Sequence, residues 1–115
     1  MGIDLSYQGS WLVAKITGEL DVASVPAVRI KLEKALAEKT AGGLILDLTD
    51  TTFMDSSGLG FVLGRYHRLA ETGGKTIVAG PQGQVRRVFE LSGLTKLIPQ
   101  TQTLAEALHA VGEEK

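Results

Sequence analysis

Apolar and polar residues follow different spacings along this chain, and each spacing predicts an element of secondary structure. They alternate over residues 3–7, which is typical of a strand with one solvated face. A turn at residues 8–10 leads to a second strand over 11–17, and we expect the two strands to form a β-hairpin. Two further runs, 44–48 and 76–79, are almost wholly apolar and indicate strands that are covered on both faces.

Between these strands the apolar residues recur every three or four positions, which predicts amphipathic helices. The second helix has the most regular pattern, and Arg65 lies off its apolar stripe. The apolar positions of the four helices are, in order, Val25, Val28, Leu32 and Leu36; Leu59, Val62, Leu63, Tyr66, Leu69 and Ala70; Val85, Val88 and Phe89; and Leu104, Ala107, Leu108 and Val111.

Residues that start and stop helices flank these stripes. Pro26 suits the first turn of the first helix, and Gly93 is placed to end the third. Thr103 and Glu106 have the spacing of a capping box before the fourth. Alternating strands and helices of this kind predict an α/β fold, with a mixed sheet of about four to five strands and about four helices.

The order of strands and helices also predicts where functional residues gather. Strand–helix–strand connections within one sheet are usually parallel and right-handed. If the strands at 11–17, 44–48 and 76–79 are parallel neighbours, the loops that follow them leave the same edge of the sheet. Binding sites in open α/β sheets lie at this edge. The three loops are residues 18–21, 49–57 and 80–83.

The overall composition narrows the class of protein. The 115 residues suit one domain spanning residues 1–115, and the 43% apolar content supplies a core. A formal net charge of -1 gives no strong field for nucleic acid or an anionic membrane, so neither is an expected partner. The chain has no cysteine, and no apolar run approaches the ~20 residues of a membrane span. Because residues 1–10 lack the pattern of a signal peptide, the expected location is the cytoplasm.

The loop before the most regular helix carries the candidate chemistry. A helix start leaves backbone N–H groups unpaired and carries partial positive charge. Asp55, Ser56 or Ser57 could each cap these groups. Gly58 and Gly60 leave the first turn bare, so that a large partner or a phosphate could approach the backbone. From these residues alone an ordinary alternative stays open, in which the serines only cap the helix and the glycines only serve its packing.

Three segments together resemble a known family. They are Thr17-Gly18-Glu19-Leu20-Asp21, Phe53-Met54-Asp55-Ser56-Ser57-Gly58-Leu59-Gly60 and Ser92-Gly93-Leu94. They are similar to the anti-sigma factor antagonists, which are single STAS domains of bacteria, and the likeness runs from about Gly2 to the last helix. Gly64-Arg65-Tyr66 resembles the sporulation subgroup of this family. The resemblance implies a STAS-type fold, a sheet flanked by helices.

The same resemblance implies a phosphorylation switch. The serine directly after the loop aspartate, Ser56, would be the phosphoacceptor, and Ser57 its unmodified neighbour. The partner would be an anti-sigma factor that is also a serine kinase. The unphosphorylated chain would bind this kinase and release the sigma factor, phosphorylation of Ser56 would switch the binding off, and a PP2C-type phosphatase would restore the hydroxyl. The implied partner-binding residues are Asp21, Asp55, Ser57, Gly58, Leu59 and Gly60.

Four residues near this serine each keep two interpretations. Asp21 either hydrogen-bonds the Ser56 hydroxyl or contacts the partner, or else it caps the helix that follows. Asp55 either positions the serine or only complements the helix dipole. Phe53 and Met54 could contact the partner, although side chains of this kind more often anchor a loop in the core.

Other functions have less support in the sequence. A serine hydrolase would need a base near Ser56, and His67 lies about 15 Å further along the same helix. We therefore expect no enzyme, and we expect no cofactor or metal. A nucleotide or small-ligand sensor stays open, because Gly80-Pro81-Gln82-Gly83 followed by Arg86-Arg87 could cradle a phosphate. A STAS subunit of another signalling or transport assembly is the remaining alternative.

Overall fold

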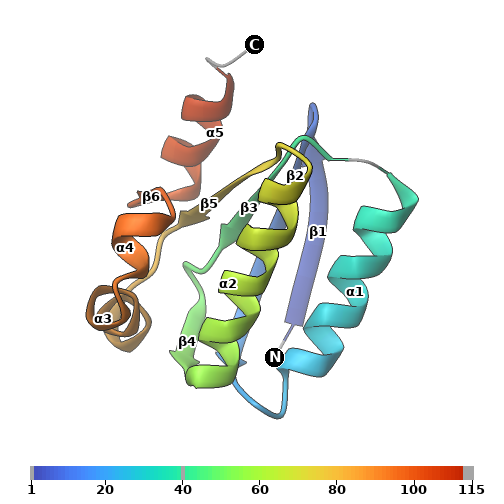
Figure 1. The fold of residues 1–115 in the computed structure, drawn as a ribbon. Helices are drawn as coiled ribbons and strands as arrows, with labels where there is room; N and C mark the ends of the chain where they lie inside the picture. Colours follow the sequence, from blue (N-terminus) through green and yellow to red (C-terminus); the bar gives the residue numbers. More distant parts are fainter. Residues whose placement is uncertain (1, 40, 113–115) are drawn as a thin grey trace.

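The computed structural model of this protein describes residues 2–39 and 41–112, so residues 1, 40 and 113–115 of the predicted domain lie outside the described part. Figure 1 shows a sheet with helices on both of its faces. In chain order the elements are β1 (Gly2–Gln8), β2 (Trp11–Leu20), α1 (Val25–Glu38), β3 (Gly43–Asp47), β4 (Thr51–Met54), α2 (Ser56–Glu71), β5 (Lys75–Ala79), α3 (Gly83–Ser92), α4 (Leu94–Leu97), β6 (Gln100–Thr101) and α5 (Leu104–Gly112).

The sheet has the strand order β1-β2-β3-β5-β6, and β4 pairs with the end of β2. β1 and β2 form the predicted antiparallel hairpin through a turn at Gly9, whose φ of 60° suits glycine. β2, β3 and β5 are parallel neighbours, which confirms the crossover argument. Every residue of β3 is buried, as the apolar run predicted. The carboxyl ends of these strands therefore share one edge of the sheet.

The sequence pattern does not show β4, and the predicted end of β2 at Thr17 is too early. β2 continues past Thr17 to Leu20, so most of the predicted loop 18–21 is strand. β4 lies inside the predicted loop 49–57 and pairs in parallel with the end of β2. β4 shows no apolar period because it has only 4 residues and the central two are exposed. Gly18 marks a register shift in the β2–β4 pairing, which hides the continuation of β2.

Helices cover the two faces of the sheet. Figure 1 shows α1 and α2 side by side on one face and α5 on the other. The larger apolar cluster lies under α1 and α2 and includes Leu32, Leu44 and Phe89, which are fully buried. The second cluster lies under α5 and consists of Trp11, Val13, Ile45, Ile77, Ala79, Ala107 and Val111. The core therefore has two layers, separated by the sheet.

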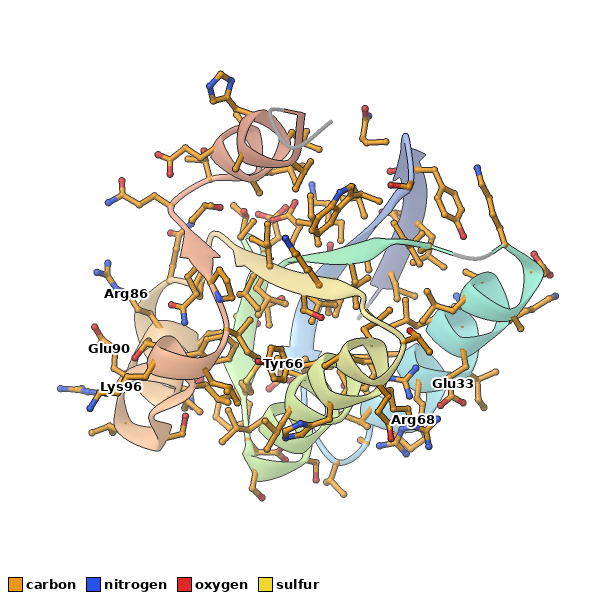
Figure 2. All side chains as sticks on the ribbon, turned by 45° about the horizontal axis from the view of Figure 1, so that its top comes forward. Glu33, Tyr66, Arg68, Arg86, Glu90 and Lys96 are labelled. Atoms are coloured by element: carbon orange, nitrogen blue, oxygen red, sulfur yellow. The ribbon has the colours of Figure 1, made fainter. Side chains whose placement is uncertain are left out.

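Arg65 departs from the predicted stripe of α2. The sequence pattern places it off the apolar face, but the structure buries it to 7% exposure. Its guanidinium donates a hydrogen bond to the Glu33 carboxylate of α1 at 3.3 Å, and Arg68 reaches the same oxygen at 3.5 Å. Figure 2 shows Glu33 and Arg68 together on this side of α2. Burial lowers the pKa of Arg65, and repulsion from Arg68 acts in the same direction.

The C-terminal part contains two short elements that the sequence pattern does not predict, α4 and β6. With α4 the described residues form five helices rather than about four. Gly93 ends α3 with a φ of 83°, as predicted. The predicted capping box of α5 forms in part: the Thr103 hydroxyl accepts the N–H of Glu106 at 3.1 Å, but the Glu106 carboxylate accepts the N–H of Gln102 at 3.0 Å in place of that of Thr103. Within the described ranges, no helix has the length and apolar character to cross a membrane.

Candidate functional site

Asp55 joins two of the loops at the carboxyl edge of the sheet. It is the N-cap of α2, and its Oδ1 accepts hydrogen bonds from the backbone N–H groups of Ser57 at 2.9 Å and Gly58 at 3.1 Å. Its Oδ2 accepts a hydrogen bond from the N–H of Val22 at 3.0 Å, in the loop that follows β2. One carboxylate therefore starts the helix and holds the neighbouring loop against it.

These hydrogen bonds keep Asp55 charged. They lower the pKa of its carboxyl group, with the bond from the Gly58 N–H contributing most, although desolvation acts in the opposite direction. The ionised side chain occupies the N–H groups of Ser57 and Gly58. The structure therefore corrects the expectation that these groups are unpaired and open to a phosphate, because the protein supplies its own anion at this helix start.

The two serines after Asp55 differ in exposure. Ser56 is the first residue of α2 and is exposed, whereas Ser57 is half-buried. Within residues 2–39 and 41–112, neither hydroxyl has a hydrogen-bond partner. The cap is Asp55 alone, so the serines are free of the capping role that the sequence left open for them. The geometry offers the Ser56 hydroxyl to solvent beside a carboxylate.

Asp21 serves the turn before α1. Its Oδ1 accepts hydrogen bonds from the N–H groups of Ala23 and Ser24, both at 3.0 Å. The Ser24 hydroxyl accepts the N–H of Asp21 at 3.0 Å and donates to the carbonyl of Glu19 at 2.7 Å. The role is local, but it is not the predicted cap, because the N-cap of α1 is Ser24 and the Asp21 side chain binds N–H groups of the turn before the helix. The described part of the chain shows no hydrogen bond between Asp21 and Ser56, and a contact of Asp21 with a partner stays a prediction.

The glycines of the first turn of α2 have different roles. Gly58 is buried, and a Cβ atom there would collide with the carbonyl of Leu20 and the side chain of Met54. Gly58 thus lets α2 begin directly on the end of β2, and it does not leave the surface bare as predicted. Leu59 is partly buried against the core. Gly60 is exposed with open space around it, which agrees with the prediction.

Gln84 of α3 completes the backbone pairing of β4, although it is not among the residues predicted for the site. Its side-chain amide accepts a hydrogen bond from the N–H of Met54 at 2.9 Å and donates one to the carbonyl of Met54 at 2.8 Å. The amide thus takes the place of a neighbouring strand on this edge. The two residues are 30 positions apart, so no local pattern in the sequence marks the contact.

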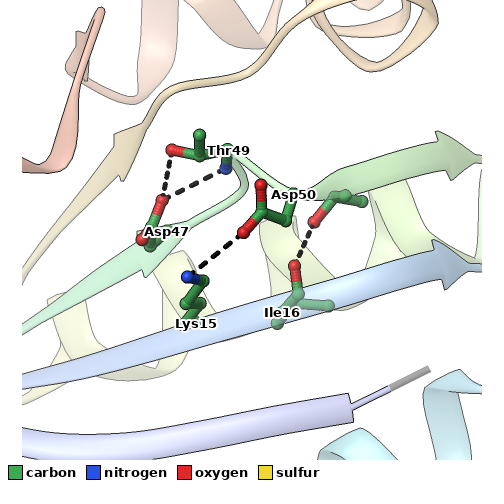
Figure 3. A network of polar contacts seen from close by, with 6 residues as sticks. Lys15, Ile16, Asp47, Thr49 and Asp50 are labelled. Atoms are coloured by element: carbon green, nitrogen blue, oxygen red, sulfur yellow. Dashed lines mark hydrogen bonds and ion pairs between the residues drawn. The ribbon is translucent and has the colours of Figure 1, made fainter.

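A polar network fixes the path from β3 to β4 (Figure 3). Asp47 accepts hydrogen bonds from the N–H of Thr49 at 3.1 Å and from its hydroxyl at 2.6 Å. Lys15 of β2 pairs with Asp50 at 3.1 Å, and this hydrogen-bonded pair raises the pKa of Lys15. The Thr51 hydroxyl donates to a carbonyl of β2 at 2.8 Å. These contacts hold β4, and with it the entry into α2, against β2.

Apolar side chains lie close to the exposed serine. Val22, whose N–H binds Asp55, is 70% exposed, and Phe53 of β4 is 39% exposed. Met54 is fully buried, so the structure divides the two loop residues between a surface role and an anchoring role. Exposed apolar side chains beside a polar helix start give this edge the mixed composition of protein-binding surfaces. Val22 is not among the residues that the sequence predicts for the site.

The residues behind the other functional hypotheses lie elsewhere. Pro81, Gln82 and Arg86 line a separate polar cleft of about 690 Å³, which also borders α5. The Arg86 guanidinium is paired with Glu90 at 3.7 Å. His67 packs edge-on against Tyr66, with their ring centroids 5.4 Å apart. Within the described residues, neither His67 nor Arg86 makes a hydrogen bond to the Ser56 hydroxyl.

The fold and this edge define the class of protein. Residues 3–107 match the STAS domain family, and the chain belongs to this family. An anti-sigma F factor antagonist of Paenibacillus polymyxa is 34% identical over 97 residues, which cover 84% of this chain and 83% of the relative. An anti-sigma F factor antagonist of Lysinibacillus sphaericus is 41% identical over 83 residues, which cover 72% of this chain and 71% of the relative.

Solved structures agree with these relatives. The anti-sigma factor antagonist SpoIIAA in its unphosphorylated form superimposes with a TM-score of 0.83 at 34% identity, covering 97% of each chain. The phosphorylated form of SpoIIAA, a Bacillus cell fate determinant, gives a TM-score of 0.75 at 33% identity and covers 96% of this chain and 99% of its own. Within the STAS family the chain is thus similar to the anti-sigma factor antagonists, which confirms the resemblance. The assignment of residues 1–115 to one domain stays a prediction.

Proposed function

We propose that this chain is an anti-sigma factor antagonist of the bacterial cytoplasm, switched by phosphorylation of Ser56. In its unphosphorylated form it binds an anti-sigma factor and so releases the sigma factor that this protein holds. The anti-sigma factor is also the serine kinase, and it uses ATP to phosphorylate Ser56, which ends the binding. A PP2C-type phosphatase returns the free hydroxyl and makes the antagonist active again.

The observation that carries this proposal is the exposed hydroxyl of Ser56 at the start of α2, beside a helix cap that does not use it. The similarity to SpoIIAA, which is known in an unphosphorylated and a phosphorylated form, supports a modification in this fold. The exposed side chains of Val22 and Phe53 supply apolar surface to a docking partner. Gly60 adds a stretch of helix that a partner can approach closely.

The structure suggests how a phosphate would act on Ser56. It would add about -1.5 to -2 charges at neutral pH. Because Asp55 already accepts the N–H groups of Ser57 and Gly58, the phosphate would stay on the surface beside a second anion. We expect the fold to tolerate this charge, since Ser56 is exposed, while the docking surface does not. A loss of about 3 kcal/mol in binding weakens a complex roughly a hundredfold.

Incubation with ATP and candidate anti-sigma factor kinases, followed by mass mapping, tests the proposal directly. We expect one phosphate, on Ser56. Ser56→Ala should bind the kinase without being modified, and Ser6→Ala, the matched control at an exposed serine of β1, should be modified like the parent chain. Ser56→Asp should bind roughly a hundredfold more weakly in calorimetry, with an unchanged circular dichroism spectrum.

Two results would contradict the proposal. One is a phosphate that maps to Ser57 or to another residue when the kinase is active. The other is Ser56→Asp binding as tightly as the unmodified chain, because the switch depends on the charge at this position. Treatment of the phosphorylated chain with a PP2C-type phosphatase should restore binding to that of the unmodified chain.

A further inference from the structure

A second cleft lies along the open edge of β5, between the helical layers. β6 pairs only with Val78 and Ala79, so the first half of β5 has no neighbouring strand on this side within the described chain. Figure 1 shows α2 and α5 on either side of this edge. The cleft has a volume of about 530 Å³, which is within the range of small-molecule sites. Its apolar lining includes Trp11, Tyr66, Ala70, Ile77, Leu97 and Ala110.

Thr76 distinguishes this cleft from an ordinary gap between helices. Its side chain is only 2% exposed and lines the cleft. Its hydroxyl oxygen is buried, and among the described residues it has no hydrogen-bond partner. A buried hydroxyl without a partner destabilises a fold, and valine has nearly the same shape without that cost. Because this oxygen has no accessible surface, a rotation of the Thr76 side chain about χ1 must first turn the hydroxyl toward the cleft, where a ligand with a hydrogen-bonding group would satisfy it.

Lys75 gives the cleft a positive charge. It is exposed, it lines the cleft, and it makes no ion pair within residues 2–39 and 41–112. The residues that line the cleft include no aspartate or glutamate among those described. The cleft therefore favours a ligand with an anionic head group, which Lys75 attracts. A cationic head group is disfavoured, because no acidic residue in the lining would offset its repulsion from Lys75.

We propose that this cleft binds a small amphipathic carboxylate. Its apolar body lies between α2 and α5. Its carboxylate accepts a hydrogen bond from the Thr76 hydroxyl, which the rotation about χ1 exposes, and the Lys75 ammonium group attracts its charge. This inference goes beyond the proposed antagonist function and does not rest on it. Tyr66 is about ten residues from Ser56 along α2, which is roughly 15 Å of helix rise, so a small ligand in the cleft does not reach the serine.

The single tryptophan of the chain makes the site easy to observe. Trp11 lines the cleft, so its fluorescence reports occupancy. Octanoate is the probe, and octanol and octylammonium present the same apolar chain with a neutral or a cationic head group. We expect saturable binding of octanoate, weaker binding of octanol and none of octylammonium. In ¹H–¹⁵N spectra, octanoate should shift the amide signals of Ala70, Thr76, Ile77 and Leu97.

Variants separate the proposed contacts. Thr76→Val should fold at least as stably as the parent chain and bind octanoate roughly tenfold more weakly. Lys75→Gln should weaken binding about threefold, whereas Lys31→Gln, an exposed lysine of α1, should leave it unchanged. Ala70→Phe should fill the cleft and abolish binding.

Several results would overturn this proposal. A lack of saturable octanoate binding, or octylammonium binding as tight as that of octanoate, would exclude an anion-selective site. An unchanged affinity of Thr76→Val for octanoate would exclude the contact with the hydroxyl. Spectral shifts that map away from β5 would place the bound octanoate elsewhere. Ser56→Ala should bind octanoate like the parent chain. A failure of the cleft proposal would therefore leave the Ser56 experiments unaffected, and a failure of those would not disturb the binding of octanoate.

Discussion

Among single residues, Asp55 determines the geometry of the candidate site. Its two carboxylate oxygens accept backbone hydrogen bonds from Val22, Ser57 and Gly58. An asparagine has one oxygen acceptor, and its amide group would face an N–H donor with another donor. It would therefore satisfy either the helix start or the neighbouring loop, but not both. The position of Val22 relative to Ser56 depends on this one charged side chain.

Asp55→Asn should be less stable than the parent chain near neutral pH, and the difference should shrink in acid. Because the pKa of Asp55 is lowered in the folded chain, its carboxylate contributes stability above the ordinary aspartate value of about 3.9. That contribution is lost as the pH falls through the folded pKa. Urea unfolding at a series of pH values measures the difference.

Glu71→Gln, at the far end of the same helix, controls for the loss of one carboxylate. The expectation would be contradicted if the difference in the free energy of unfolding between Asp55→Asn and the parent chain stayed constant into strong acid. Such a result would mean that the cap acts through shape alone and not through its charge.

Among the elements, β4 is the one that most needs outside support. It has only 4 residues and pairs with the end of β2 through a shifted register. A pairing of only two strands is marginal without further contacts. The Lys15–Asp50 pair holds its beginning, and Gln84 holds the backbone of Met54 at its end. Since α2 begins two residues after β4, these contacts also position Ser56.

Gln84→Ala should lower the free energy of unfolding by about 1–2 kcal/mol, because both hydrogen bonds to Met54 are lost. Gln84→Glu is the sharper variant. At neutral pH its carboxylate accepts the Met54 N–H but repels the Met54 carbonyl, and in acid the protonated group can again donate. Its deficit should therefore diminish as the pH falls, while that of Gln84→Ala should not.

Gln82→Ala is the matched control for these variants, since Gln82 precedes α3 and makes no side-chain capping bond. Its free energy of unfolding should lie within about 0.5 kcal/mol of that of the parent chain. If Gln84→Ala were as stable as this control in urea, Gln84 would not support β4.

The sequence predicted those helices and strands whose own residues show a regular spacing of apolar side chains. The stripe of α2 and the apolar run of β3 result from burial, and burial of one face or of both leaves a period in the sequence. β4 could not be predicted in this way, because its stability comes from β2 and from Gln84. The same holds for Arg65, whose burial depends on Glu33 of another helix.

For the candidate site, the family resemblance alone identifies the loop with Asp55 and Ser56. The sequence did not show that Asp55 holds Val22, because the two residues are 33 positions apart and are joined only by the parallel strands. It also did not show that Gly58 is buried, since its need for space arises from the carbonyl of Leu20.

In the whole molecule, the two faces of the sheet are covered unequally. α1 and α2, with α3 and α4 at their side, cover a large apolar cluster. α5 has 9 residues and buries only Ala107 and Val111. Hydrophobic stabilisation is roughly proportional to the buried apolar area, so α5 is held less strongly than the helices of the other face. The cleft at β5 lies where this thinner layer meets the thicker one.

Hydrogen exchange should reveal this difference in native conditions. The amides of α5 should exchange through a local opening that leaves β3 and α2 protected, because fewer apolar contacts must break. Mass spectrometry of exchanged peptides can measure both regions in one experiment. Equal protection of α5 and β3 would show that the molecule opens only as a whole, contrary to this prediction.

The way in which Asp55 occupies the start of α2 has a consequence for how the proposed switch behaves in a cell. A phosphate on Ser56 finds no place inside the fold, so the two forms differ mainly in surface potential. Such a difference is screened over about 8 Å at physiological salt and about 3 Å at 1 M. When the internal salt of a bacterium rises during osmotic stress, the difference in surface potential between the phosphorylated and the unphosphorylated form would therefore act over a shorter distance. The switch would weaken in this way without any chemical change in either form.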